Sequence, residues 1–289
     1  MSRISSTTLL LAFIAVPAFG QFVPGLLQNR SYWGDGKSEM DFYDAEFVRD
    51  GEPHRCEVVA ILTPLFVEPE TLARVDTGRQ SPAIPAIEMA LTATVPRGLT
   101  VELRSIEALW RLDSMSLARL SFAGSDAFGN ITKVLRENRE ANRVSWIYSG
   151  ESYEGRIERQ PMLPAEKAMV AYDELPLRVR MLDFTKPAGE FDIDLAPTLA
   201  SRTKMFDPLK PAKLSWKTND RAIQVELQHA AGKDRFVLDA GFPFLLREWA
   251  AYDGTHWKMT NSFKADPRKY LQNGDRERAW KDPMLRHPD

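Results

Sequence analysis

The sequence has few of the residues on which common functional sites depend. It contains one cysteine, Cys56, so no disulfide can form within the chain. We interpret Cys56 as a small buried apolar residue, with a nucleophile or an intermolecular disulfide as the alternatives. The four histidines, His54, His229, His256 and His287, form neither H-x-x-x-H nor H-E-x-x-H, which excludes a zinc site within one local segment. We therefore expect no metal and no other cofactor.

Two further absences narrow the range of partners. The 38 lysines and arginines are balanced by 40 aspartates and glutamates, which leaves a net charge of -2, and the two signs are mixed along the chain. Because there is no basic stripe, we expect no nucleic-acid partner. After residue 20, no apolar run approaches the ~20 residues of a membrane-spanning helix. We therefore expect no transmembrane segment in the mature chain.

Local catalytic motifs are also scarce. The nucleophile motif G-x-S-x-G is absent. Residues 201–204 read SRTK and match S-x-x-K, but that chemistry needs a helix that places the lysine beside the serine. Pro197 and Pro208 flank the match too closely for a long helix, and no K-T-G motif accompanies it. We interpret the match as chance, so the catalytic and ligand-binding residues stay unknown from the sequence.

The first 20 residues are typical of a secretory signal peptide. Arg3 supplies a positive charge, residues 9–16 form an apolar run, and the small residues Ala18 and Gly20 follow. This order predicts cleavage near the Gly20–Gln21 bond. We therefore expect an exported protein, located in the periplasm or outside the cell.

The remaining chain is patterned mainly as β-strands. In residues 214–263, apolar and aromatic runs are separated by turn residues, which predicts an antiparallel meander. Within it, Ile223, Val225 and Leu227 fall on every second position, so they share one face of a strand.

A hairpin is predicted where Asp253-Gly254 separates Trp249 from Trp257. Aspartate followed by glycine suits a type I′ turn, in which both central residues have positive φ. We further expect strands at residues 39–47, 57–66, 87–94, 99–112, 115–122, 128–135, 144–148 paired with 152–157, and 190–195.

Two of these strands carry qualifications. Residues 99–112 also fit helical spacing, but the turn residues on both sides favour a strand. In residues 115–122 the alternation slips by one position, which a β-bulge would absorb.

Residues 177–182 also alternate, with three apolar residues separated by Arg178 and Arg180. We predict a strand here, paired as a hairpin with residues 190–195. That pairing places Asp192 and Asp194 beside the two arginines. We interpret the group as cross-strand salt bridges on a solvated face; a pair of carboxylates for acid/base catalysis is the alternative.

The expected fold is mainly β, with antiparallel meanders and few short helices. The strands form either one large curved sheet or two consecutive β lobes. If there are two, residues 21–160 form the N-terminal lobe and residues 161–265 the C-terminal lobe, and a polar tail follows at 266–289. The division falls at residues 160–174, where two prolines bracket a short predicted helix at 165–169.

Two sets of residues suggest a functional site. His229 and His256 could meet across the meander with Asp239 or Asp253, as a metal or acid/base site, although surface histidines explain them more simply. The seven tryptophans could line a groove for a sugar or lipid, or pack within the sheet. They are Trp33, Trp110, Trp146, Trp216, Trp249, Trp257 and Trp280.

Three stretches together resemble a family of uncharacterised exported β-rich bacterial proteins. They are YWGDGKSE at 32–39, WIYSGESYEG at 146–155, and residues 242–249. The resemblance covers nearly all of the mature chain and implies no established activity. Some members of the family are labelled as septum formation inhibitors, which implies an intracellular nucleotide pyrophosphatase. This chain lacks the N-terminal S-x-S-P-R-R motif of that enzyme and begins with an export signal, so we reject the label.

The function that best fits these observations is a non-enzymatic, exported binding or envelope-associated protein. A concave sheet face would hold a lipid-like or other apolar ligand, or the partner would be a cell-envelope component. The alternative is an exported hydrolase with a non-local histidine and carboxylate site. A pocket with His229 or His256 beside a carboxylate favours the enzyme, whereas an apolar trough without convergent polar groups favours the binding protein.

Overall fold

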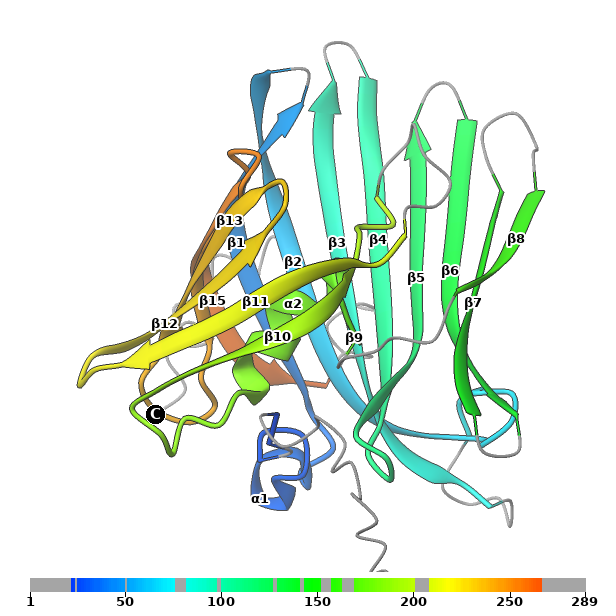
Figure 1. Cartoon of the computed structure of the whole chain (residues 1–289), viewed down its shortest axis with the longest axis horizontal. Coiled ribbons are helices and arrows are strands. Elements are labelled where there is room, and N and C mark those ends of the chain that lie inside the picture. The colour runs from blue at the N-terminus through cyan, green and yellow to red at the C-terminus, as the bar shows by residue number, and fades with distance from the viewer. Residues whose placement is uncertain are drawn as a thin grey trace, which may run out of the picture.

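The strands form one continuous hydrogen-bonded sheet (Figure 1). The computed structural model describes residues 22–23, 25–49, 51–75, 82–97, 100–126, 129–140, 143–151, 157–162, 169–200 and 208–266. The first eight strands are β1 (Ser38–Arg49), β2 (Glu52–Val67), β3 (Ile84–Arg97), β4 (Thr100–Arg111), β5 (Ser116–Asp126), β6 (Gly129–Glu140), β7 (Arg143–Glu151) and β8 (Ile157–Met162). The others are β9 (Met169–Ala171), β10 (Ala188–Ala196), β11 (Lys210–Thr218), β12 (Ala222–His229), β13 (Gly232–Asp239), β14 (Leu246–Ala250) and β15 (His256–Ala265).

The helices are short. They are α1 (Arg30–Trp33) and α2 (Leu175–Arg178), and the 3₁₀ turns η2 (Tyr172–Glu174) and η3 (Val179–Met181) flank α2. Among the described residues, no helix is both long and apolar enough to span a membrane.

The order of the strands shows how the sheet is built. It runs β8-β7-β6-β5-β4-β3-β2-β1-β15-β14-β13-β12-β11-β10-β9. The chain therefore leaves β1 as one meander, and a second meander returns to pair β15 with the free edge of β1. Neighbouring strands are antiparallel except β9 and β10, which are parallel. This arrangement confirms the mainly β prediction, in the form of one large sheet.

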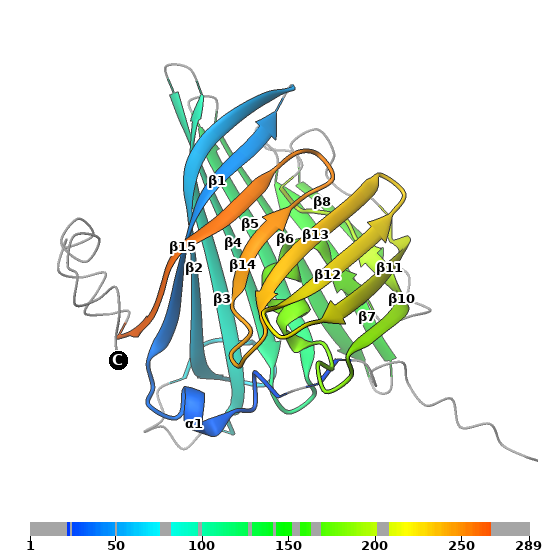
Figure 2. The same ribbon diagram turned by 90° about the vertical axis from the view of Figure 1, so that its left-hand side faces the viewer.

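The sheet curls so that its two meanders face each other across a shared interior (Figures 1 and 2). α2 lies inside, between β10–β12 and the wall formed by β2–β4. The main core contains buried side chains from both meanders, among them Trp110, Phe122, Leu227 and Phe236. The halves therefore share one apolar core, and whether either half folds alone as a lobe stays a prediction.

The central segment, residues 169–182, corrects the sequence-based interpretation. We predicted a strand at 177–182 in a hairpin with 190–195, but these residues form α2 and η3 inside the sheet. Pro176 starts α2 at a position where helices tolerate proline. The alternation was misleading because Arg178 and Arg180 are also buried, at 4% and 2% exposure. The alternation therefore did not mark a strand with one solvated face.

The partner of β10 changes accordingly. β10 pairs antiparallel with β11, and Asp192 lies opposite Lys213 rather than beside an arginine of the central segment. The predicted cross-strand group of Asp192, Asp194, Arg178 and Arg180 is therefore wrong.

Other local predictions are confirmed. Residues 214–263 form the meander β11–β15, with Ile223, Val225 and Leu227 buried on one face. Residues 100–111 are the strand β4, not a helix. The bulge lies in β5, where Leu109 is opposite Arg119 and Trp110 is opposite Leu117.

The β14–β15 hairpin also forms as predicted, but its turn differs. Trp249 lies opposite Trp257, and Gly254 has positive φ. Asp253 is not among the positive-φ residues, so the turn is not type I′. Its side chain instead accepts a hydrogen bond from the backbone N–H of Thr255, at 2.9 Å.

The signal peptide at 1–20, the helix at 165–169 and the polar tail at 266–289 stay predictions, because nearly all of these residues lie outside the described ranges.

Gly189 permits a close approach between β10 and β11. A Cβ added at this position would lie 2.1 Å from the ring of Trp216, which is buried on β11. We expect Gly189→Ala to lower the free energy of unfolding by about 1–3 kcal/mol, because the ring has little room to move. Urea denaturation measures the change.

The matched control is Gly241→Ala, since an added Cβ there meets nothing within 4 Å. It should stay within about 0.5 kcal/mol of the wild type. Equal losses for the two variants would contradict the packing argument.

Candidate functional site

A cavity of about 220 Å³ lies inside the curled sheet. One wall comes from β1–β4. The opposite wall comes from η2, β14, β15 and the turn at 251–255, which joins the last two strands. Tyr252 and Asp253 in this turn are exposed, so the mouth of the cavity lies there.

Strand alternation builds the apolar wall. On β3, Leu91 and Ala93 are buried and line the cavity, while the intervening Thr92 and the following Thr94 are exposed. The register places Leu91 opposite Ile106 of β4, which also lines the cavity. The period of two therefore brings apolar side chains together on the inner face.

The opposite wall is aromatic. Trp249 and Trp257 face each other across the β14–β15 pair with ring centroids 4.8 Å apart. Tyr172 of η2 lies 5.6 Å from Trp249, and Tyr43 lies 5.7 Å from Trp257. These two tryptophans line the cavity, whereas Trp33, Trp110 and Trp216 are buried in the core. The side chains of Trp146 and Trp280 lie outside the described residues.

The charged groups of the cavity have partners of their own. Arg104 forms a fork with Glu102, at 2.9 and 3.4 Å, and lies over the Phe47 ring at 5.3 Å. Asp173 accepts hydrogen bonds from the Thr198 hydroxyl and from the Leu199 N–H, both at 2.6 Å. Burial raises the pKa of Asp173, against the opposing effect of these bonds.

A buried acid lies behind the aromatic wall. Asp234 accepts hydrogen bonds from the Tyr172 hydroxyl at 3.1 Å and from the Tyr252 N–H at 2.7 Å. His229 Nε2 is 3.3 Å from Asp234 Oδ2, although the two atoms are not aligned as a hydrogen bond. Burial raises the pKa of Asp234. Neither His229 nor Asp234 lines the cavity.

The predicted histidine site does not form. The acidic neighbour of His229 is Asp234, not Asp239 or Asp253. His256 instead pairs with Glu248 at 2.8 Å on the half-exposed side of the hairpin. Asp239 forms a two-bond ion pair with Arg247. Within the described ranges, no group of three potential metal ligands gathers.

The remaining sequence candidates are placed as follows. Cys56 is half-buried on β2, and burial raises the pKa of its thiol to about 11. It is therefore a thiol at neutral pH and a weak nucleophile. The S-x-x-K match at 201–204 lies outside the described residues.

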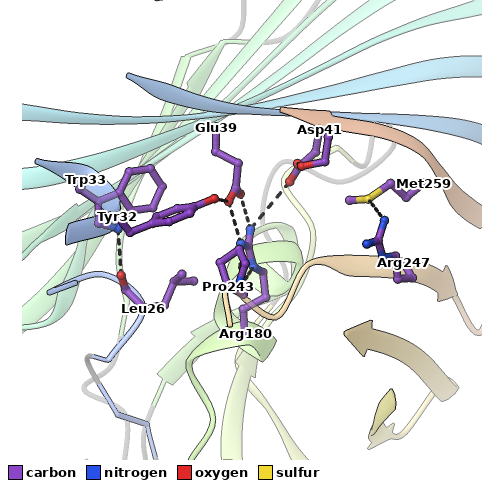
Figure 3. A network of polar contacts seen from close by, with 10 residues as sticks. Leu26, Tyr32, Trp33, Glu39, Asp41, Arg180, Pro243, Arg247 and Met259 are labelled. Atoms are coloured by element: carbon purple, nitrogen blue, oxygen red, sulfur yellow. Dashed lines mark hydrogen bonds and ion pairs between the residues drawn. The ribbon is translucent and has the colours of Figure 1, made fainter. Parts of the chain in front are cut away.

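Near α1, Arg180 of the central segment is the centre of a second polar cluster, whose three charged side chains are buried (Figure 3). Its guanidinium donates to both oxygens of Glu39 on β1, at 2.6 and 3.0 Å. It also donates to the backbone oxygen of Pro243, at 3.0 and 3.3 Å, and lies 3.8 Å from Asp41. The Tyr32 hydroxyl donates to Glu39. One side chain thus joins the central segment, β1 and the loop before β14.

The two acids of this cluster differ in protonation. Burial alone would raise the pKa of Glu39, but the charge and hydrogen bonds of Arg180 outweigh it and hold that pKa below its ordinary value. Burial and the neighbouring Glu39 charge raise the pKa of Asp41 well above its ordinary value. Glu39 and Arg180 therefore form a charged pair, and Asp41 is the acid whose protonated form burial favours.

The sequence reasoning missed this cluster and the cavity. In the sequence, Glu39 and Asp41 alternate with Met40 and Phe42 like the polar face of a half-buried strand, and only the structure shows both faces buried. Two of the three stretches singled out in the sequence contribute residues to this cluster. Residues 32–39 supply Tyr32 and Glu39, and residues 242–249 supply Pro243.

Comparisons with known proteins do not indicate a function. No family model matches the chain, and no curated protein matches it. A solved structure that is similar is a β-barrel-like protein of the domain of unknown function DUF1849 from Brucella abortus. It is 8% identical, with a TM-score of 0.44, and the match covers 80% of this chain and 98% of that one.

We expect Arg180→Met to lower the free energy of unfolding by about 3–5 kcal/mol, since it leaves a buried carboxylate without its cation. The matched control is Arg247→Met, which breaks the half-exposed pair with Asp239. That change should cost about 1 kcal/mol or less. Chemical denaturation measures both variants, and similar losses would contradict the assigned role of Arg180.

Asp41→Asn tests whether folding raises the pKa of Asp41. An acid whose pKa is raised by folding destabilises the protein as the pH rises from its unfolded toward its folded pKa. The variant has no such proton, so its stability relative to the wild type should increase with pH above about 4. Unfolding free energies measured from pH 4 to 8 give this difference. Asp44→Asn, at an exposed position of the same strand, should show no such trend.

Proposed function

We propose that this chain is an exported, non-enzymatic binding protein that holds an apolar, lipid-like ligand in the cavity between β1–β4 and β14–β15. The observation that carries the proposal is the lining of the cavity. Its walls are mainly apolar and aromatic side chains, the inner charged side chains Asp173 and Arg104 are bound to their own partners, and Asp253 lies at the exposed mouth. Sites for apolar ligands are typically concave and apolar with few polar groups.

The volume of the cavity indicates how much of a ligand it can enclose. An engineered apolar cavity of about 150 Å³ holds benzene. At about 220 Å³, this cavity accommodates something larger than one aromatic ring. It is smaller than the ~300–1,000 Å³ of sites for drug-sized molecules. A single acyl chain, or the end of a longer one, fits these limits.

The alternative, an exported hydrolase, rests on the pair of His229 and Asp234. Tyr172 contacts both the cavity and Asp234, and so lies between them. A catalytic base must come within hydrogen-bond distance of its substrate. His229 does not line the cavity, which is why the binding role is preferred.

If the protein is exported, the cell envelope is a source of the ligand. If residues 1–20 direct secretion, the mature chain meets the lipids and other components of the cell envelope. Native mass spectrometry of the chain purified from the exported fraction of its own cells would then show an additional mass of lipid size.

Filling the cavity should abolish binding. Ala93→Leu adds three carbons to the inner wall, whereas Thr94→Leu places the same side chain on the outer face of the same strand. We expect calorimetry with 1-octanol to show at least tenfold weaker binding for Ala93→Leu and unchanged binding for Thr94→Leu. Circular dichroism checks that both variants are folded. Wild-type affinity in a folded Ala93→Leu variant would overturn this location for the ligand.

A further inference from the structure

The cavity holds unused hydrogen-bond donors, while its inner acceptor is occupied. We propose that it selects acyl ligands that end in a carboxylate, which accepts hydrogen bonds and donates none. This inference rests on the proposed binding function and names the class of ligand.

The first donors are two indoles. Trp249 and Trp257 line the cavity, and each is 5% exposed. Neither indole N–H has a hydrogen-bond partner within the described part of the chain. A buried donor left without an acceptor costs about 1–3 kcal/mol. The two rings lie 4.8 Å apart by centroid, and a ligand oxygen that reaches either N–H would remove this cost.

Arg104 adds donors of higher strength. A guanidinium has five N–H groups, and the fork with Glu102 uses one on Nε and one on Nη2. Nη1 makes no hydrogen bond to any described residue, and Arg104 lines the cavity. A bond from a cation to a carboxylate is about twice as strong as one between neutral groups.

The inner acceptor is already used. Both oxygens of Asp173 accept bonds, from Thr198 and from the backbone of Leu199. The Thr198 hydroxyl donates to Asp173 and accepts from the Ala200 N–H at 3.0 Å. The charges of Lys133 and Arg104 also act on this carboxyl group, which disfavours an ammonium head group beside it. The other acid of the lining, Asp253, is exposed at the mouth, where solvent and salt screen its charge.

The volume of the cavity limits the length of the ligand's acyl chain. Scaling from benzene, with six carbons in about 150 Å³, gives roughly eight or nine carbons for this volume. Octanoate is therefore a suitable probe, and 1-octanol and octylammonium share its chain with different polar ends. At pH 8 octanoate is an anion and octylammonium a cation, so the three compounds compare head groups alone.

The test is calorimetric titration of the folded wild-type chain with the three compounds at one salt concentration. We expect octanoate to bind at least tenfold more tightly than 1-octanol, and octylammonium at least tenfold more weakly. Equal affinities would overturn the carboxylate inference and leave the apolar pocket in place. If none of the three binds, both the inference and the proposed function fail.

Variants locate the donors. Trp249→Phe and Trp257→Phe each remove an indole N–H and keep an aromatic ring, so each should reduce the preference for octanoate over 1-octanol about threefold or more. The ratio of the two affinities is used because both ligands have the same acyl chain, so a larger cavity changes both affinities alike. Trp216→Phe is the matched control, because Trp216 has a buried, unpartnered indole N–H but lies outside the cavity. A loss of preference in Trp216→Phe equal to that of the other two would overturn the assignment.

Discussion

The buried pair of Arg180 and Glu39 is the interaction on which the interior of this protein depends. Both side chains are removed from water, at about 2% exposure or less, so each ion needs the other to offset the cost of its desolvation. Arg180 belongs to the central segment and Glu39 to the strand at the middle of the sheet. Satisfying the two charges therefore holds the central segment inside the curled sheet, and this position defines the space left for the cavity.

Hydrogen-bonded polar groups inside the sheet include three separate sets. Arg180 binds Glu39 and Pro243, Asp173 binds residues 198–199, and Asp234 binds Tyr172 and the backbone of Tyr252. Unpartnered buried polar groups are costly, so such sets are what a stable interior requires. Six buried atoms among the described residues depart from this rule: Arg178 Nε, His229 Nε2, Asp234 Oδ2 and the indole nitrogens of Trp216, Trp249 and Trp257. Of these residues, Trp249 and Trp257 line the cavity.

Much of the fold could be predicted because the relevant signals are local. The period of two in residues 222–227, the slip in 115–122 and the glycine turn before Trp257 each depend on neighbouring residues, and each appears in the structure. The central segment could not be predicted in this way. Its arginines look like the wet face of a strand, but both are buried. Arg180 of η3 pairs with Glu39 of a distant strand, whereas the acid beside Arg178 is Glu174 of the same segment.

The sequence by itself determined the class of fold, because hydrophobic periodicity and turn chemistry act over a few residues. Tertiary structure alone decided the site. The cavity draws on strands β1–β4 and on β14–β15, which are separated by more than 100 residues in the sequence but brought together by the closing pair β1–β15. Arg180 and Glu39 are far apart in the sequence and meet only in the folded chain. Trp249 and Trp257 face each other within a local hairpin, but the closing pair places that hairpin beside β1. Hydrogen bonding between distant strands leaves no periodic trace in either strand, so their pairing could not be inferred from the sequence.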